Sequence, residues 1–267
     1  MKLVYFNSFF LLWLFLNTAC TNLSPEQEFA KGVQKLSSKD FEGAINSFDK
    51  VIKIRPNFSD AFYYRGIAKN ELLGPEGYNK EEIDEDLKKG ISESSTDTIK
   101  LFKRASLSIQ HQNYRQAFKD YYRITAIDKR NIMSYKLRII NAPVLRSLYD
   151  YSEYDRLKDL NSIIELVPND QKAYDERITI YYRQSNFEGA IEDITKLISL
   201  NKDPIEVARL YGQRGQFKSW LGYKYNDVNF YKDALLDFEL YLKEFRRGDS
   251  DISDQAIDAC KEAIGVQ

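Results

Sequence analysis

The chain has 267 residues, which is enough for one or two folded domains. Apolar residues make up 43% and charged residues 30%, a balance that excludes wholesale disorder. The 39 basic and 40 acidic side chains nearly cancel, so the basic surface typical of nucleic-acid binding is not indicated and no nucleic-acid partner is expected. Two cysteines, Cys20 and Cys260, exclude a disulfide framework, because they could form one bridge at most.

Residues 1–19 predict a signal peptide for export. Lys2 supplies the positive start, and residues 9–16 form an unbroken apolar run. This run is too short to span a bilayer, which takes about 20 residues, and it suits the apolar centre of a cleaved signal.

Residues 16–20, Leu-Asn-Thr-Ala-Cys, resemble a lipobox, the segment that precedes a lipidated cysteine. Thr18 and Ala19 are small, as the lipobox requires, although Leu16 lies one position further from the cysteine than is usual. The resemblance implies a lipidated Cys20 that anchors the mature chain to a membrane of the bacterial cell envelope, at the outer membrane or periplasm rather than in the cytoplasm. The alternative is ordinary cleavage after Ala19, which leaves Cys20 as a thiol.

The first helix is expected to begin just after the anchor. Ser24 can cap it, Pro25 suits its first position, and Gln27 completes a capping box. Residues 20–24 are then the lipidated N-terminus and a tether that reaches roughly 15 Å at most, which would hold the folded part close to the membrane.

Internal repeats organise the rest of the chain. The pentapeptide Phe-Glu-Gly-Ala-Ile occurs at 41–45 and again at 187–191, and Gly32 and Gly66 lie 34 positions apart. A small residue followed four positions later by a large apolar one recurs at Ala44 and Phe48, Ala117 and Tyr121, Ala190 and Ile194, and Ala234 and Phe238. The small residues allow neighbouring helices to approach closely, and the large ones fill the space between them. This period and this motif resemble the tetratricopeptide repeat family, as found in bacterial lipoproteins of that type.

The resemblance implies an all-α, right-handed superhelical solenoid of about six helix-turn-helix repeats over residues 25–247, closed by a C-terminal capping helix within 248–267. The expected repeats are 25–58, 59–97, 98–131, 132–170, 171–204 and 205–247. Pro143 is expected to interrupt the first helix of repeat four. Extra residues around Trp220 and 223–225 either prolong the first helix of repeat six or form a loop. Cys260 is expected to be buried on the apolar side of the cap.

Motifs that would indicate catalysis are absent from the sequence. His111 is the single histidine, in a predicted turn, and is interpreted as a surface side chain. The acidic run 81–86 lies at a helix start, where carboxylates favour the helix dipole and stay solvated. We therefore expect no enzymatic activity, no metal site and no cofactor.

In the tetratricopeptide family the first helix of each repeat lines a concave groove that binds the ligand. By register, the resemblance implies a partner-binding groove that includes Phe29, Val33, Tyr63, Ile67, Asn70, Phe102, Ser106, Lys136 and Tyr182. About half of the apolar members are expected to pack against a neighbouring helix instead. The family's clamp of lysine, asparagine and arginine for a terminal carboxylate is missing, since apolar Phe29, Val33 and Ile67 stand at the corresponding early places. An apolar, aromatic groove favours an extended or helical protein segment.

The function that follows from this resemblance is a membrane-anchored scaffold or adaptor for protein–protein interaction in the cell envelope. The alternative is a lipoprotein that captures a glycan or small ligand with surface aromatics, motivated by 19 tyrosines. A flat exposed platform of aromatic rings would favour the glycan, and a continuous groove would favour the peptide.

Overall fold

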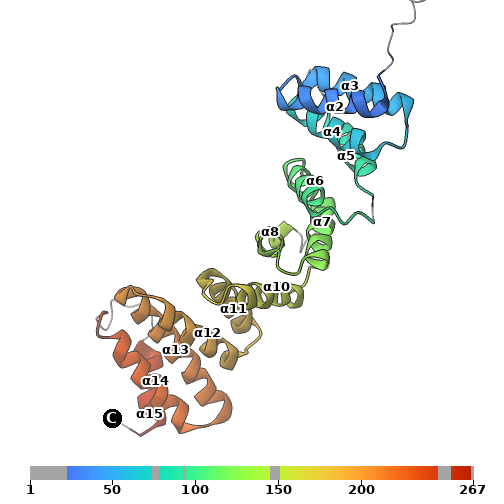
Figure 1. Cartoon of the computed structure of the whole chain (residues 1–267). Coiled ribbons are helices and arrows are strands. Elements are labelled where there is room, and N and C mark those ends of the chain that lie inside the picture. Colours follow the sequence, from blue (N-terminus) through green and yellow to red (C-terminus); the bar gives the residue numbers. More distant parts are fainter. Residues whose placement is uncertain (1–22, 74–77, 93, 145–150, 246–253, 266–267) are drawn as a thin grey trace, which may run out of the picture. The chain divides into compact units, whose positions relative to one another are not determined.

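The computed structural model describes residues 23–73, 78–92, 94–144, 151–245 and 254–265. These residues are helical apart from turns and an isolated bridge between Leu73 and Tyr78, which confirms the all-α class. The chain divides into two compact units, Met1–Asn113 and Tyr114–Gln267, here called the N-terminal and C-terminal units (Figure 1). The predicted signal peptide, 1–19, and the predicted lipidation site, Cys20, lie outside the described residues.

The described part of the N-terminal unit contains two helix-turn-helix pairs and one further helix, α6 (Thr98–Gln110). The paired helices are α2 (Pro25–Ser37), α3 (Phe41–Ile54), α4 (Ser59–Glu71) and α5 (Lys80–Gly90). In pairwise packing, α2 lies against α3 and α4 against α5, and α3 also lies against α4. Such stacking of neighbours is how repeat proteins build a continuous core.

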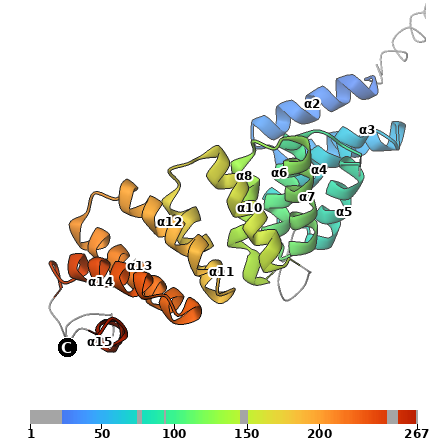
Figure 2. The ribbon, with the colours of Figure 1, turned by 90° about the horizontal axis from the view of Figure 1, so that it is seen from below.

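The C-terminal unit continues the same pattern (Figure 2). Its helices are α7 (Tyr114–Ile127), α8 (Ile132–Ile140), α10 (Glu153–Leu166), α11 (Gln171–Arg183), α12 (Phe187–Leu200), α13 (Pro204–Tyr225), α14 (Val228–Tyr241) and α15 (Asp254–Ala263). Helix α8 ends at Ile140, ahead of Pro143. This end is expected, because proline lacks a backbone N–H donor and its ring clashes with the preceding turn of a continuing helix. The extra residues of repeat six prolong α13 to 22 residues rather than forming a loop.

Helix starts follow the predicted chemistry. The capping box at Ser24 is confirmed: its hydroxyl accepts from the Gln27 amide, and the Gln27 side chain accepts from the Ser24 amide. Both copies of the repeated pentapeptide begin a helix in the same way. Asp40 accepts from the Gly43 amide before α3, and Asn186 accepts from the Gly189 amide before α12.

Small residues opposite large ones set the helix packing, as predicted. A Cβ added to Gly32 of α2 would lie 2.6 Å from Cε1 of Phe48, and one added to Gly215 of α13 would lie 2.9 Å from Cε1 of Phe238. Phe48 and Phe238 are almost completely buried, and Ala44 and Ala234 beside them are fully buried. Only a missing side chain lets each ring lie directly against the facing backbone.

A buried arginine–aspartate pair, which we did not predict, recurs inside the repeats. Three arginines in first helices donate through Nε and Nη2 to both oxygens of an aspartate in the second helix of the same repeat. The pairs and their two distances are Arg65 with Asp86 (2.9 and 2.6 Å), Arg177 with Asp193 (2.8 and 2.5 Å), and Arg214 with Asp237 (2.9 and 2.7 Å). Arg138 and Asp159 pair at the matching place in repeat four.

Each of these three arginines also reaches the preceding repeat. Their Nη1 groups donate to Asp49 at 2.6 Å, Asn161 at 2.7 Å and Thr195 at 3.0 Å, respectively. The guanidinium groups lie over the aromatic ring three residues earlier, at 5.3 Å for Phe62, 5.6 Å for Tyr174 and 5.1 Å for Tyr211. One planar side chain thus joins three helices, and its fixed fork of donors suits that role.

The C-terminal helix covers the end of the stack. Ile257 and Cys260 of α15 are buried against Ala234, Phe238 and Tyr241 of α14. Cys260 is thus the buried small residue that we predicted, and burial raises the pKa of its thiol from an ordinary 9.0 to about 11.

This burial predicts slow thiol chemistry in a Cys20→Ser variant, where Cys260 is the sole thiol. At pH 8 the folded protein should react with iodoacetamide roughly a hundredfold more slowly than the urea-unfolded protein, because the thiolate fraction is that much smaller. The preference for the neutral thiol stabilises the fold fully below pH 9 and is lost as the pH rises toward 11. Equal labelling rates in the two states would contradict the burial of Cys260.

Candidate functional site

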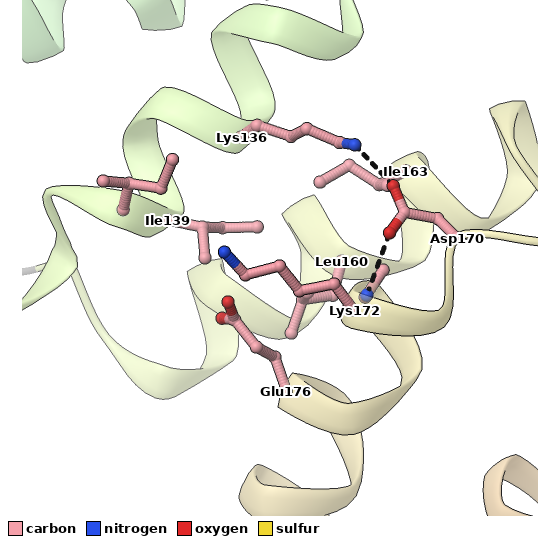
Figure 3. Close-up of a pocket in the computed structure, with 9 residues that line it drawn as sticks. Lys136, Ile139, Leu160, Ile163, Asp170, Lys172 and Glu176 are labelled. Carbon is pink, nitrogen blue, oxygen red and sulfur yellow. Dashed lines mark hydrogen bonds and ion pairs between the residues drawn. The ribbon is translucent and has the colours of Figure 1, made fainter. Parts of the chain in front are cut away.

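A hollow of about 50 Å³ lies among α8, α10 and α11 in the C-terminal unit (Figure 3). The residues that line it are Lys136, Ile139, Ile140, Leu160, Ile163, Asp170, Lys172, Ala173 and Glu176. Helices α8 and α11 are the first helices of consecutive repeats, so the hollow lies where the register predicts a ligand groove.

The floor of the hollow is apolar. Ile139, Leu160 and Ile163 are buried and belong to one hydrophobic cluster with Ala173 and Ile180. The next residue of α8, Ile140, is 61% exposed at the edge of this floor. An exposed isoleucine that adjoins a concave apolar floor is a natural contact for an apolar side chain from another molecule.

The rim of the hollow is charged. Lys136 Nζ lies 2.5 Å from Asp170 Oδ2, and Asp170 Oδ1 accepts from the Ala173 amide at 3.2 Å, which caps α11. Lys172 and Glu176 extend from α11 toward Ile139 (Figure 3). Glu176 is bonded by Arg156, whereas Lys172 forms no ion pair with any residue that the structure describes.

Three predicted groove residues of the first two repeats pack in or on the core of the N-terminal unit. Phe29 and Val33 are half-buried and pack on the cluster around Phe48, where the Phe29 and Phe48 ring centroids are 5.7 Å apart. Tyr63 is 6% exposed and lies under the ammonium of Lys100. Tyr63 therefore belongs to the core, whereas Phe29 and Val33 pack on the core and keep part of their surface exposed.

Four further predicted groove residues of this unit are half-buried. They are Ile67, Asn70, Phe102 and Ser106. The Ser106 hydroxyl donates to the Phe102 carbonyl of its own helix, and Asn70 Oδ1 lies 3.0 Å from His111 Nε2.

His111 corrects one prediction. We expected a surface side chain, but His111 is 7% exposed, and its Nδ1 lies 2.9 Å from Asp84 Oδ1. His111 is the C-cap of α6, and its ring faces α4 and α5 rather than solvent. Asp84, expected to be solvated in the acidic run, is half-buried and also accepts from Asn113.

Of the predicted groove residues in the C-terminal unit, Lys136 lines the hollow and Tyr182 lies at the end of α11. Tyr182 is 50% exposed. Its ring stacks on Trp220 and on Phe217 of α13, with centroids 5.5 and 5.9 Å away. The prolonged α13 thus supplies the surface on which this tyrosine rests.

No described helix combines the length and apolarity needed to cross a membrane. Within the same ranges, no cluster of three or more histidine, cysteine or acidic side chains is arranged to hold a metal ion.

No model of a known protein family matches the chain. A DnaJ homolog subfamily C member 7 homolog from Dictyostelium discoideum is 24% identical over 187 residues, which cover 70% of this chain. The chain spans only 29% of that relative's length.

Similar helix arrangements occur in solved structures. A chain in a structure of Naa15/Naa10 bound to HypK-THB aligns with a TM-score of 0.53 at 12% identity, over 92% of this chain and 39% of that one. YrrB, described as a TPR protein with an unusual peptide-binding site, aligns with a TM-score of 0.47 at 14% identity, over 66% of this chain and 86% of that one. The paired helices define the fold as a tetratricopeptide-type solenoid.

Proposed function

We propose that the protein is a non-enzymatic scaffold that binds a segment of a partner protein in the hollow among α8, α10 and α11. The observation that carries this proposal is the exposed Ile140 beside a concave apolar floor, between the first helices of consecutive repeats. Lys136 at the rim is paired with Asp170, whereas Lys172 forms no ion pair with a described residue and adds a preference for negative charge. A segment that places an apolar side chain on Ile140 and a carboxylate near Lys172 would match both features.

Photo-crosslinking in cells tests this proposal. A benzoylphenylalanine at Ile140 should yield one dominant protein adduct, and the same group at Leu236 of α14 is a matched control because Leu236 is 59% exposed. Lys172→Glu should weaken the Ile140 adduct by reversing the charge at the rim. Equal adducts from both positions, or none from Ile140 in a folded protein, would contradict binding in this hollow.

The proposal includes a lipid anchor in the bacterial cell envelope. It rests on the lipobox-like residues 16–20 and on the short tether before α2. Metabolic labelling with alkyne-palmitate should mark the wild-type protein in the membrane fraction and leave Cys20→Ser unlabelled. A labelled Cys20→Ser variant, or an unlabelled wild type, would argue against lipidation at this cysteine.

Glycan capture is a second candidate because of the half-exposed Tyr182, which is stacked on Trp220. A sugar face could lie on this ring. Loss of glycan binding in Tyr182→Ala, with the Ile140 crosslink intact, would favour this second candidate.

A further inference from the structure

A second and larger hollow in the C-terminal unit is lined by residues of α7, α8 and α10. Its volume is about 500 Å³, within the range of roughly 300–1,000 Å³ that is usual for small-molecule sites. It shares no lining residue with the hollow of Figure 3. On α8 the second hollow uses Tyr135 and Arg138, whereas the first uses Lys136, Ile139 and Ile140.

Aromatic side chains are among the residues that line this second hollow. Phe118 and Tyr122 come from α7, and Tyr135 comes from α8. The guanidinium carbon of Arg138 lies 6.0, 5.3 and 5.3 Å from their respective ring centroids. Tyr122 is 58% exposed, so part of its ring remains open to a molecule in the hollow.

The buried polar groups of the hollow leave one donor unused. Arg138 pairs with Asp159, which also accepts from the Tyr151 hydroxyl at 2.7 Å. Arg138 is almost fully buried, yet its Nε has no hydrogen-bond acceptor among the described residues. A buried donor without an acceptor is uncommon, because the group loses its hydration and gains no hydrogen bond in exchange.

The charges around the hollow favour an anion. Lys129 beyond the end of α7 and Lys158 on α10 are exposed lining residues, and neither forms an ion pair within the described part of the chain. The two lining carboxylates are already bonded: Asp159 as above, and Asp155 by the Ser152 amide and hydroxyl at 3.0 and 2.6 Å. Arg138 neutralises Asp159, whereas the Ser152 donors are neutral and leave Asp155 charged. The lining therefore has three cations against two carboxylates, an excess of one positive charge.

We propose that this hollow binds a small organic anion that carries a flat ring. The ring lies against the open part of Tyr122, and the anionic group lies toward Lys129 and Lys158. Stacking on an aromatic ring and attraction to two cations are separate contributions, and each is removed by a different substitution.

Two fluorescent probes separate these contributions in the full chain. 8-Anilinonaphthalene-1-sulfonate has a flat ring system and one sulfonate, and N-phenyl-1-naphthylamine is its uncharged counterpart. We expect one site for the sulfonate probe. The Lys129→Ala and Lys158→Ala double variant should weaken this probe about tenfold and leave the uncharged probe unchanged, whereas Tyr122→Ala should weaken both.

Lys136→Ala in the hollow of Figure 3 is the control and should leave both affinities unchanged. Tyr122 and both lysines are exposed, so these variants should keep the wild-type circular dichroism and unfolding midpoint. The proposal is overturned if the folded wild type does not bind the sulfonate probe, or if its affinity is the same in the lysine variant and in wild type.

Discussion

Asp237→Ala is expected to lower the free energy of unfolding of the C-terminal unit by about 3 kcal/mol. Asp237 is buried and accepts two hydrogen bonds from Arg214. It also forms an ion pair with Lys218, whose Nζ lies 2.8 Å from Asp237 Oδ2. Removal of the carboxylate leaves two cations facing each other without their shared partner, and breaking a buried pair in this way typically costs about 3–5 kcal/mol. The lower figure applies here because both cations are partly exposed.

Urea unfolding followed by circular dichroism measures this loss. Glu239→Ala is the matched control, since Glu239 is exposed on the same helix and should change stability by less than about 0.5 kcal/mol. Asp237→Leu combined with Arg214→Met should recover part of the loss, because it removes the pair instead of breaking it. Equal effects of Asp237→Ala and Glu239→Ala would refute the structural role of the pair.

The second large effect concerns the contact between Gly32 and Phe48. Phe48→Ala should cost about 3–5 kcal/mol, because a fully buried ring is lost and a cavity remains. Gly32→Ala should cost about 1–3 kcal/mol, because its Cβ would lie 2.6 Å from the Phe48 ring. In the double variant the new methyl group enters the space that the ring has left.

The double variant should therefore be more stable than the sum of the two losses predicts, by about 1 kcal/mol or more. A double-mutant cycle in urea gives this coupling directly. Gly66→Ala combined with Phe48→Ala is the control. The Cβ added at Gly66 would lie closest to the buried Leu87 side chain, at 3.1 Å, so these two losses should add. Strict additivity for Gly32 and Phe48 would show that the two residues do not constrain each other.

Local features of this fold could be predicted from the sequence because they depend on neighbours along the chain. The capping box at Ser24 and the motif of small Ala44 followed by large Phe48 follow from spacing alone, whereas the contact of Phe48 with Gly32 is shown only by the structure. The end of α8 before Pro143 follows from the chemistry of proline.

The arginine–aspartate pairs could have been found but were not. In each case an aromatic residue precedes the arginine by three positions, as Tyr174 precedes Arg177. The aspartate stands directly before a large apolar residue of the second helix, as Asp193 precedes Ile194. Charged residues are usually solvated, and so this spacing was not recognised as a core feature. The prediction for His111 was wrong for a similar reason: residues in turns are usually exposed, but His111 is buried.

The candidate site was predictable only in part. Register assigns a residue to a face of its helix, but it does not determine what covers that face. Lys136 therefore lines the hollow as the register suggests, while Tyr63 at the matching place in repeat two is buried. The larger hollow lined by α7, α8 and α10 depends on side chains from these three helices, and no spacing within one helix indicates it.

The measurement that tests the scaffold most directly is the affinity of the captured partner for three proteins: wild type, Ile140→Asp and Leu236→Asp. Both substitutions place one carboxylate on a similarly exposed apolar residue of the same unit. Binding in the hollow predicts that titration calorimetry finds Ile140→Asp at least about tenfold weaker than wild type, with Leu236→Asp unchanged. Wild-type affinity in Ile140→Asp would contradict the proposed function.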